Sequence, residues 1–120
     1  MLKQEIDATN KGTYDFLYLP CNVARKRNFG YAFVNFSDVG FAITFAEKFI
    51  GKRWNRFNSD KRCSLSYANI QGKVALIEKY RNSTVMQQDE SCRPKLFYTS
   101  GPRIGQEEPF PIPVTMLMLF

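Results

Sequence analysis

Side chains suited to nucleic-acid binding alternate along residues 31 to 36. Because successive side chains of a strand point to opposite faces, Tyr31, Phe33 and Asn35 would share one face. Two aromatic rings beside an amide make a poor core but a good platform for unpaired bases. We expect Tyr31 and Phe33 to stack on bases and Asn35 to hydrogen-bond a base edge. A basic run that could hold phosphates precedes them: Arg25, Lys26 and Arg27.

The other face of the same stretch is wholly apolar and has the character of ordinary core, with Ala32, Val34 and Phe36. Residues 29–36 also match seven of the eight positions of the third-strand signature of RNA-recognition motifs. Phe29 stands where that signature has a cation, so Arg27 would have to supply the phosphate contact. The alternative is a buried strand with aromatic residues on both faces.

The net charge of +6 lies around this strand. Residues 21 to 62 hold nine Lys or Arg against three Asp or Glu, and the rest of the chain is balanced. Such a field attracts polyanions. The competing interpretation is a set of solvated basic loops.

The composition argues against most enzyme classes. Histidine, the usual general base near neutral pH and the commonest metal ligand, is absent from the sequence. Cys21, Cys63 and Cys92 are an odd number without metal-ligand spacing, and we expect free thiols in a reducing compartment. No stretch has the length of a membrane span, and the start resembles no signal peptide. We therefore expect a non-enzymatic protein of the nucleus or cytoplasm, with no cofactor, no metal and no membrane contact.

Hydrophobic periodicity predicts the elements that would position these residues. The first strand leaves two assignments open: Leu17 and Leu19 in the core with Phe16 and Tyr18 outward, where Tyr18 would join the RNA surface, or the reverse. The expected helices cover residues 1–9, 39–50 and 71–81, with a Ser37-Asp38 cap before the second. The expected strands cover residues 13–20, 31–36 and 63–68.

The remaining segments have weaker patterns. Residues 21–28 and 51–62 are expected to be basic loops, and Trp54 in the second would either stack on a base or plug the end of the core. Beyond residue 82 only Lys95 to Tyr98 has strand character. Pro109 to Pro113 should be extended.

Several separate motifs occur in a set order and spacing: Gly12 to Pro20 (GTYDFLYLP), Gly30 to Phe36 (GYAFVNF), Phe57-Asn58-Ser59, Gln71-Gly72-Lys73 and Cys92-Arg93-Pro94. Together they closely resemble the C-terminal RNA-recognition motif of the Mei-two-like meiosis regulators. The likeness covers roughly residues 1 to 111.

The resemblance implies an α+β, ferredoxin-like RNA-recognition motif (βαββαβ plus a C-terminal helix) with its first strand missing from the chain. In the family that strand lies between the third and fourth, so its absence would split the sheet. The implied organisation is an incomplete motif with appended helix at 1–81, a family-like extended segment at 82–113 and an apolar tail at 114–120. The tail would either fill the vacant strand position or be an altered chain end with no role in the fold.

The function implied is a single-stranded RNA-binding module in post-transcriptional control of meiosis or development. Two alternatives stay open. A sheet with exposed edges could take up a strand from a protein partner. The chain could also be a non-functional truncated fragment of such a domain.

Overall fold

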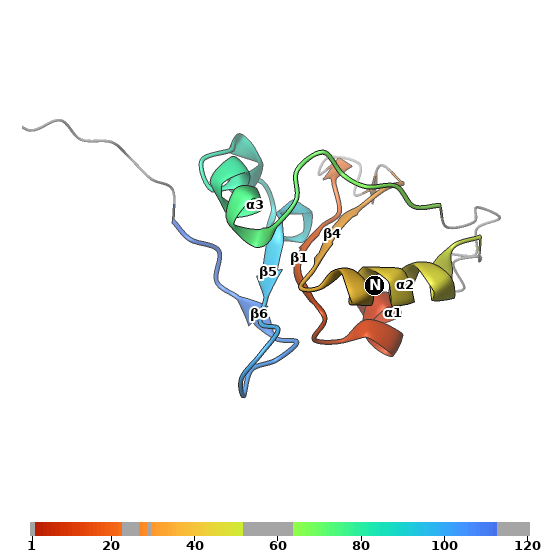
Figure 1. The fold of residues 1–120 in the computed structure, drawn as a ribbon. Coiled ribbons are helices and arrows are strands. Elements are labelled where there is room, and N and C mark those ends of the chain that lie inside the picture. Colours follow the sequence, from red (N-terminus) through yellow and green to blue (C-terminus); the bar gives the residue numbers. More distant parts are fainter. Residues whose placement is uncertain (1, 23–26, 29, 52–63, 113–120) are drawn as a thin grey trace, which may run out of the picture.

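The computed structural model describes residues 2–22, 27–28, 30–51 and 64–112. These form an α+β fold in which a four-stranded antiparallel sheet lies between helices (Figure 1). Helices α1 (Leu2–Asn10) and α2 (Val39–Phe49) pack on one face, and α3 (Lys73–Tyr80) packs on the other.

The sheet runs in the order β4-β1-β5-β6, and neighbouring strands are antiparallel. Its strands are β1 (Tyr14–Tyr18), β4 (Phe33–Phe36), β5 (Lys95–Phe97) and β6 (Glu107–Glu108). In the central register Leu17 lies opposite Val34, Tyr18 opposite Phe33, and Phe16 opposite Leu96. The segment after residue 82 therefore adds two strands to the sheet, of which β5 was expected and β6 was not. It also contains two short 3-10 helices, η1 (Thr84–Gln87) and η2 (Glu90–Cys92).

The first core lies between the sheet and helices α1 and α2. Leu2 and Ile6 are one helical turn apart on α1, so both side chains face this core. Ile6 is fully buried, and Leu2 packs against the cluster. Ile6 packs with Tyr14, Leu17 and Phe45, and the expected inward residues of β4, Val34 and Phe36, pack against the same cluster. Helix α2 starts where the sequence places its cap, since the Asp38 carboxylate accepts a hydrogen bond of 2.9 Å from the Gly40 amide.

The second core lies under α3. Phe16 and Leu96 are buried against Leu76 of α3, and Tyr18 and Tyr80 pack against them. Leu17 thus faces the first core and Phe16 and Tyr18 face the opposite side, which settles the assignment left open for β1. Phe16 is nevertheless fully buried, because α3 covers it.

Residues 21–28 are not simply a loop. Cys21–Asn22 (β2) and Arg27–Asn28 (β3) pair antiparallel as a two-stranded ribbon, with Cys21 opposite Asn28 and Asn22 opposite Arg27. Residues 23–26 between them lie outside the described part of the chain. The prediction missed this pairing because two residues are too few for a visible alternation.

The strand expected over 63–68 is not formed within its described part, 64–68, which carries no ladder pairing. The alternating pattern is present, but a strand also needs a neighbour to bond. β4 ends the sheet on this side among the described residues. The prediction of a paired strand here was wrong for lack of a partner between the two.

The prediction that all cysteines are free thiols was also wrong. Cys21 and Cys92 form a disulfide, with Cα atoms 5.5 Å apart although 71 positions separate them in sequence. The fold brings β2 next to the end of η2, which local spacing cannot reveal. Cys63, the second basic segment with Trp54, and the tail at 114–120 lie outside the described residues. In the regions that the structure describes, none of the helices has both the length and the apolar character needed to cross a membrane.

Candidate nucleic-acid interface

Four aromatic rings meet on the sheet face that carries α3. We call Tyr18, Tyr31, Phe33 and Tyr80 the aromatic platform. Tyr18 stacks on Phe33 with ring centroids 6.3 Å apart and planes 21° apart, because the two residues are opposite each other across β1 and β4. Tyr31 meets Phe33 edge-on at 5.8 Å, and Tyr80 meets Tyr18 edge-on at 5.4 Å. The platform therefore runs from the margin of β4 to the end of α3.

The platform is open at one end and covered at the other. Tyr31 is 55% exposed and Phe33 is 36% exposed, although both are large and apolar. At the covered end, burial raises the pKa of the Tyr18 and Tyr80 hydroxyls, with a smaller contribution from neighbouring tyrosines. Tyr31 and Phe33 therefore present accessible aromatic surface, whereas Tyr18 and Tyr80 are packed against the second core.

Asn35 lies on the same face but is already engaged. Its Nδ2 donates to the Asp15 carboxylate at 2.8 Å, and its Oδ1 accepts from the Gly72 amide at 3.1 Å. A weaker contact of 3.4 Å joins Nδ2 to the Phe36 carbonyl. Gly72 is the residue before α3, so Asn35 fixes the start of that helix to the sheet. The sequence predicted the face of Asn35, but its amide binds the protein's own groups in this structure.

The model of the RNA recognition motif 2 family matches residues 1–81. The chain belongs to this family. Meiosis protein mei2 of Schizosaccharomyces pombe is 56% identical over 113 residues, which make up 94% of this chain and 15% of that protein. Protein MEI2-like 4 of rice is 51% identical over 112 residues, covering 93% of this chain and 11% of that protein. Protein MEI2-like 1 of Arabidopsis thaliana is 51% identical over 112 residues, covering 93% and 12%.

The resemblance deduced from the motifs is thereby confirmed. This RNA recognition motif 2 chain spans between 11% and 15% of the length of these relatives. The matched region of residues 1–81 contains β1, β4 and the three α-helices, and so all four rings of the platform.

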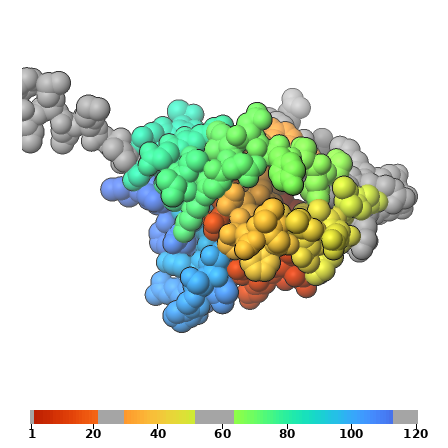
Figure 2. All heavy atoms as spheres, viewed as in Figure 1, coloured from red at the N-terminus to blue at the C-terminus, as the bar shows by residue number. Residues whose placement is uncertain are grey.

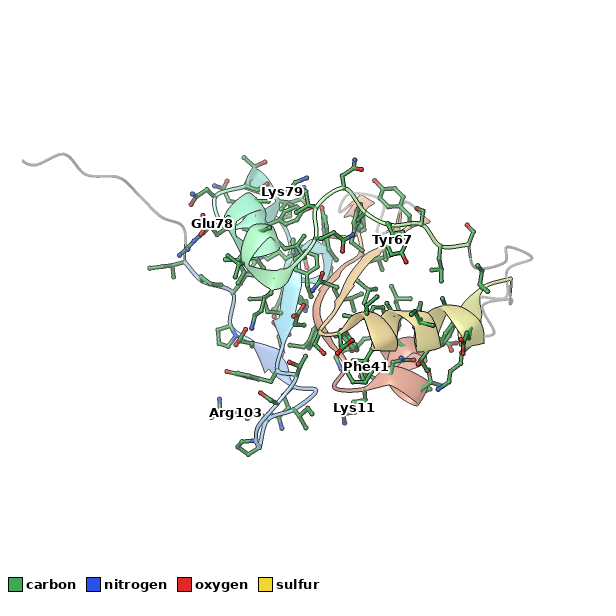
Figure 3. All side chains as sticks on the ribbon, viewed as in Figure 1. Lys11, Phe41, Tyr67, Glu78, Lys79 and Arg103 are labelled. Atoms are coloured by element: carbon green, nitrogen blue, oxygen red, sulfur yellow. A yellow bond between two sulfur atoms is a disulfide. The ribbon has the colours of Figure 1, made fainter. Side chains whose placement is uncertain are left out.

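The predicted phosphate-binding cations of this domain are only partly described. Arg25 and Lys26 lie outside the described residues, and Arg27 is described as part of β3 without its side chain. A cation that the sequence reasoning did not select lies at the platform instead: the Lys79 ammonium is 5.3 Å from the centroid of the Tyr80 ring (Figure 3). Arg81 is two residues further along the chain, and its guanidinium already donates a hydrogen bond to the Ile112 carbonyl at 2.9 Å.

Tyr80 and Lys79 were missed because they belong to a helix at the far end of the motif. Helical spacing puts Tyr80 on the apolar stripe of α3 with Leu76 and Ile77, and all three pack in the second core. It does not show which surface that stripe covers. Tyr80 stacks on Phe16 at 5.7 Å as well as touching Tyr18, so it belongs to both the second core and the platform. Phe16 could have indicated this packing, because an apolar side chain that points away from the first core has to be buried by another element.

Proposed function

We propose that this domain binds single-stranded RNA through the aromatic platform and carries out no catalysis. The observation that carries the proposal is the pair of open rings, Tyr31 and Phe33, next to each other on one sheet face. Stacking needs only an accessible aromatic face, and each stacked base contributes about 1 to 3 kcal/mol. The excess of Lys and Arg over residues 21–62 favours a polyanion over an uncharged ligand.

Within this proposal, β1 and β4 correspond to the second and third strands of a ferredoxin-like RNA-recognition motif. β4 carries the third-strand signature, and α2 follows it as the split βαββαβ order requires. The position of the first strand is then the space beyond β4. Arg25, Lys26 and Arg27 would position the RNA through its phosphates and would add no sequence preference.

The biological setting is inferred from the relatives. The name of the Schizosaccharomyces pombe relative links that protein to meiosis. We infer a role for this domain in post-transcriptional control of meiosis or development, in the nucleus or cytoplasm where its RNA would be found. Because the chain spans a small part of those proteins, the RNA-binding domain is the unit to which the proposal applies.

Binding of a fluorescein-labelled pool of short single-stranded RNA to the full chain, followed by anisotropy, tests the proposal. Tyr31→Ala should weaken binding by about 1 to 3 kcal/mol, because one stacking ring is lost. Phe41→Ala is the matched control, since Phe41 is a 42% exposed ring on α2, away from α3 (Figure 3). Affinity should also fall with added salt.

Two results with these variants would contradict the proposal. If Tyr31→Ala and Phe41→Ala weaken binding equally, the platform is not the binding surface. If neither changes affinity while both variants keep the melting temperature of the unchanged chain, the stacking proposal is wrong. A circular dichroism melt of each variant separates loss of binding from loss of fold.

A further inference from the structure

The cations of α3 and of the segment after it differ in whether a protein group already binds them. In the described part of the chain, the engaged pairs are Lys73 with Glu108 (2.7 Å), Lys95 with Glu107 (3.7 Å), Arg81 with the Ile112 carbonyl (2.9 Å) and Arg93 with the Gln88 carbonyl (2.7 Å). Arg103 lies at the opposite end of the domain from α3 (Figure 3). These cations are therefore either bound by the protein itself or distant from the aromatic platform.

Lys79 is different. Its side chain is exposed in the last turn of α3, and among the described residues no carboxylate pairs with it. Its ammonium lies 5.3 Å from the centroid of the Tyr80 ring, which is close enough for a cation–π interaction. Because this contact already restrains the side chain, less conformational entropy is lost when an anion binds to it.

The platform leads from its open rings to this lysine. Phe33 contacts Tyr31 at 5.8 Å on one side and Tyr18 at 6.3 Å on the other. Tyr18 in turn contacts Tyr80, and the Lys79 ammonium lies over the Tyr80 ring. The charge is thus at the end of a continuous series of aromatic contacts.

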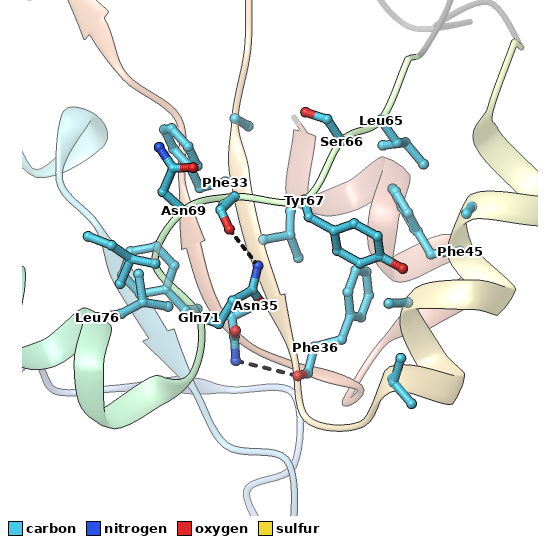
Figure 4. Close-up of a pocket in the computed structure, with 18 of the residues that line it drawn as sticks. Phe33, Asn35, Phe36, Phe45, Leu65, Ser66, Tyr67, Asn69, Gln71 and Leu76 are labelled. Atoms are coloured by element: carbon cyan, nitrogen blue, oxygen red, sulfur yellow. Dashed lines mark hydrogen bonds between the residues drawn. The ribbon is translucent and has the colours of Figure 1, made fainter.

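Helix α3 and strand β4 also meet at the surface of the domain. In Figure 2 the surface of residues 64–80 (green) lies beside that of β4 (orange). Phe33, Tyr80 and Lys79 border one cavity, of which Figure 4 is a close-up. The cavity itself is the position assigned above to the first strand of the fold, so only its border with α3 would belong to the RNA surface. A nucleic-acid strand that runs from Phe33 towards α3 would pass the Lys79 ammonium.

The two ends of the platform offer a nucleotide different contacts. At the open end, Tyr31 and Phe33 present accessible rings. At the other end, Tyr18 and Tyr80 pack against the second core, which leaves less ring surface for a base. A cation can hold the phosphate of a nucleotide at this end instead, because a lysine ammonium binds phosphate as a point charge.

We propose that Lys79 holds a phosphate of the RNA where the strand passes from the open rings onto α3. This inference rests on the RNA-binding function proposed above. Bases stack on Tyr31 and Phe33, and the phosphate of a neighbouring nucleotide lies at the Lys79 ammonium. Because the phosphate is the same in every nucleotide, Lys79 adds affinity without sequence preference. α3 is then part of the RNA surface as well as the cover of the second core.

A purely structural role is the alternative for Lys79. A lysine in the last turn of a helix interacts favourably with the partial negative charge of the helix C-terminus. Loss of that interaction would lower the melting temperature and leave the salt dependence of RNA binding unchanged. The two roles therefore have separate readouts.

The salt dependence of binding, measured by anisotropy with a labelled oligouridine of about six nucleotides, tests the proposal on the full chain. Lys79→Gln should weaken binding by about two- to fivefold at low salt. It should also flatten the plot of log affinity against log salt by about 0.7, the value for one phosphate contact on a single strand. Lys79→Arg should keep the slope, because it keeps the charge.

Lys48→Gln is the matched control. Lys48 is an exposed lysine in the last turn of α2, which packs on the opposite face of the sheet. Its replacement removes the same net charge as Lys79→Gln but should leave the slope as it is. A circular dichroism melt of each variant shows whether the fold is kept.

Probes with one uncharged methylphosphonate linkage locate the phosphate. At one linkage, this change should weaken binding to the unchanged chain by about two- to fivefold. The same probe should bind Lys79→Gln no more weakly than the unmodified oligouridine does, because the contact is already absent. Such a result couples Lys79 to one particular phosphate.

Two results would overturn the assignment of Lys79 alone. One is an equal change of slope in Lys79→Gln and Lys48→Gln. The other is a set of probes in which every uncharged linkage weakens binding to Lys79→Gln as much as to the unchanged chain. If Tyr31→Ala still weakens binding in either case, RNA binding by the platform stands without Lys79. If the unchanged chain binds no oligouridine and no RNA pool, the proposed function fails and this inference fails with it.

Discussion

The two faces of the sheet are closed to different extents. On the face under α1 and α2, Ile6, Tyr14 and Phe45 form a continuous core. On the face under α3, Phe16 is equally buried, yet Tyr31, on the same side of the domain, is more than half exposed. α3 covers the side of the sheet at β1 and β5 and stops short of the margin at β4.

This difference shows how a small domain combines stability with an accessible aromatic surface. An uncovered aromatic face would cost burial that a small domain needs. Here the second core, with Phe16 and Leu96, stabilises the sheet next to the open rings. The consequence is a gradient across one face: residues under α3 should behave as core, and residues at the margin of β4 should behave as surface.

The largest expected effect compares the two cores directly. Phe16→Ala should destabilise the domain by about 3 to 5 kcal/mol and Ile6→Ala by about 2 to 5 kcal/mol, because each removes a fully buried side chain. Chemical denaturation of the full chain measures both. Val74→Ala, at an exposed site on α3, should change stability by less than about 0.5 kcal/mol. If Phe16→Ala costs as little as Val74→Ala, α3 is not packed on the sheet and the two faces differ more than described.

A smaller effect is expected where Asn35 links the sheet to the start of α3. Asn35→Ala removes the bonds to Asp15 and to the Gly72 amide and leaves a nearly buried carboxylate without this donor. We expect a loss of about 1 to 3 kcal/mol and faster hydrogen exchange at the first turn of α3. Asn69→Ala, at an exposed asparagine, is the control. Unchanged exchange in α3 would mean that the Gly72 contact does not hold the helix in place.

The smallest expected effect is a pH dependence above pH 10. Burial raises the pKa of Tyr14 well above its ordinary value of 10.0, and the hydrogen bond to Asp7 and the charge of that carboxylate add to this. The unfolded chain then loses this proton at a lower pH than the folded chain. The contribution of the Tyr14 hydroxyl to the free energy of unfolding is fully present below pH 10 and falls as the pH rises beyond it.

Tyr14→Phe should flatten this alkaline fall, measured as denaturation midpoints over a pH series. Asp7→Asn should keep most of it, because burial is the largest cause of the raised pKa. A fall that persists in full in Tyr14→Phe would place the titration at other residues. The covered end of the platform, with raised pKa values at Tyr18 and Tyr80, would then be the next site to test.

Local patterns were sufficient for the elements whose signals are local. The Leu2 and Ile6 spacing, the Asp38 cap and the alternation up to Phe36 correctly predicted α1, α2 and β4. They also placed Tyr31 and Phe33 on an accessible surface, although RNA binding by these rings stays a prediction.

Contacts between distant segments were not predictable in the same way. The strand pattern over 64–68 is correct as a pattern, but pairing depends on a neighbouring strand, and the described residues supply none there. Tyr80 joins the platform only because α3 folds back over Phe16. Asn35 shares a face with the rings, as expected, but the partners of its amide come from β1 and from the residue before α3. Each of these depends on tertiary packing, which no short window of sequence contains.

The Cys21–Cys92 bond also changes what kind of polymer the chain is. When oxidised it is a closed ring with two tails, and β4, α2 and α3 all lie within the ring. A break in the backbone anywhere between the two cysteines leaves one covalent molecule, whereas a break in either tail releases a fragment. β4 and α3, which carry Phe33 and Tyr80, therefore stay on one molecule after a single cut in the ring, and reduction is needed to separate the two pieces.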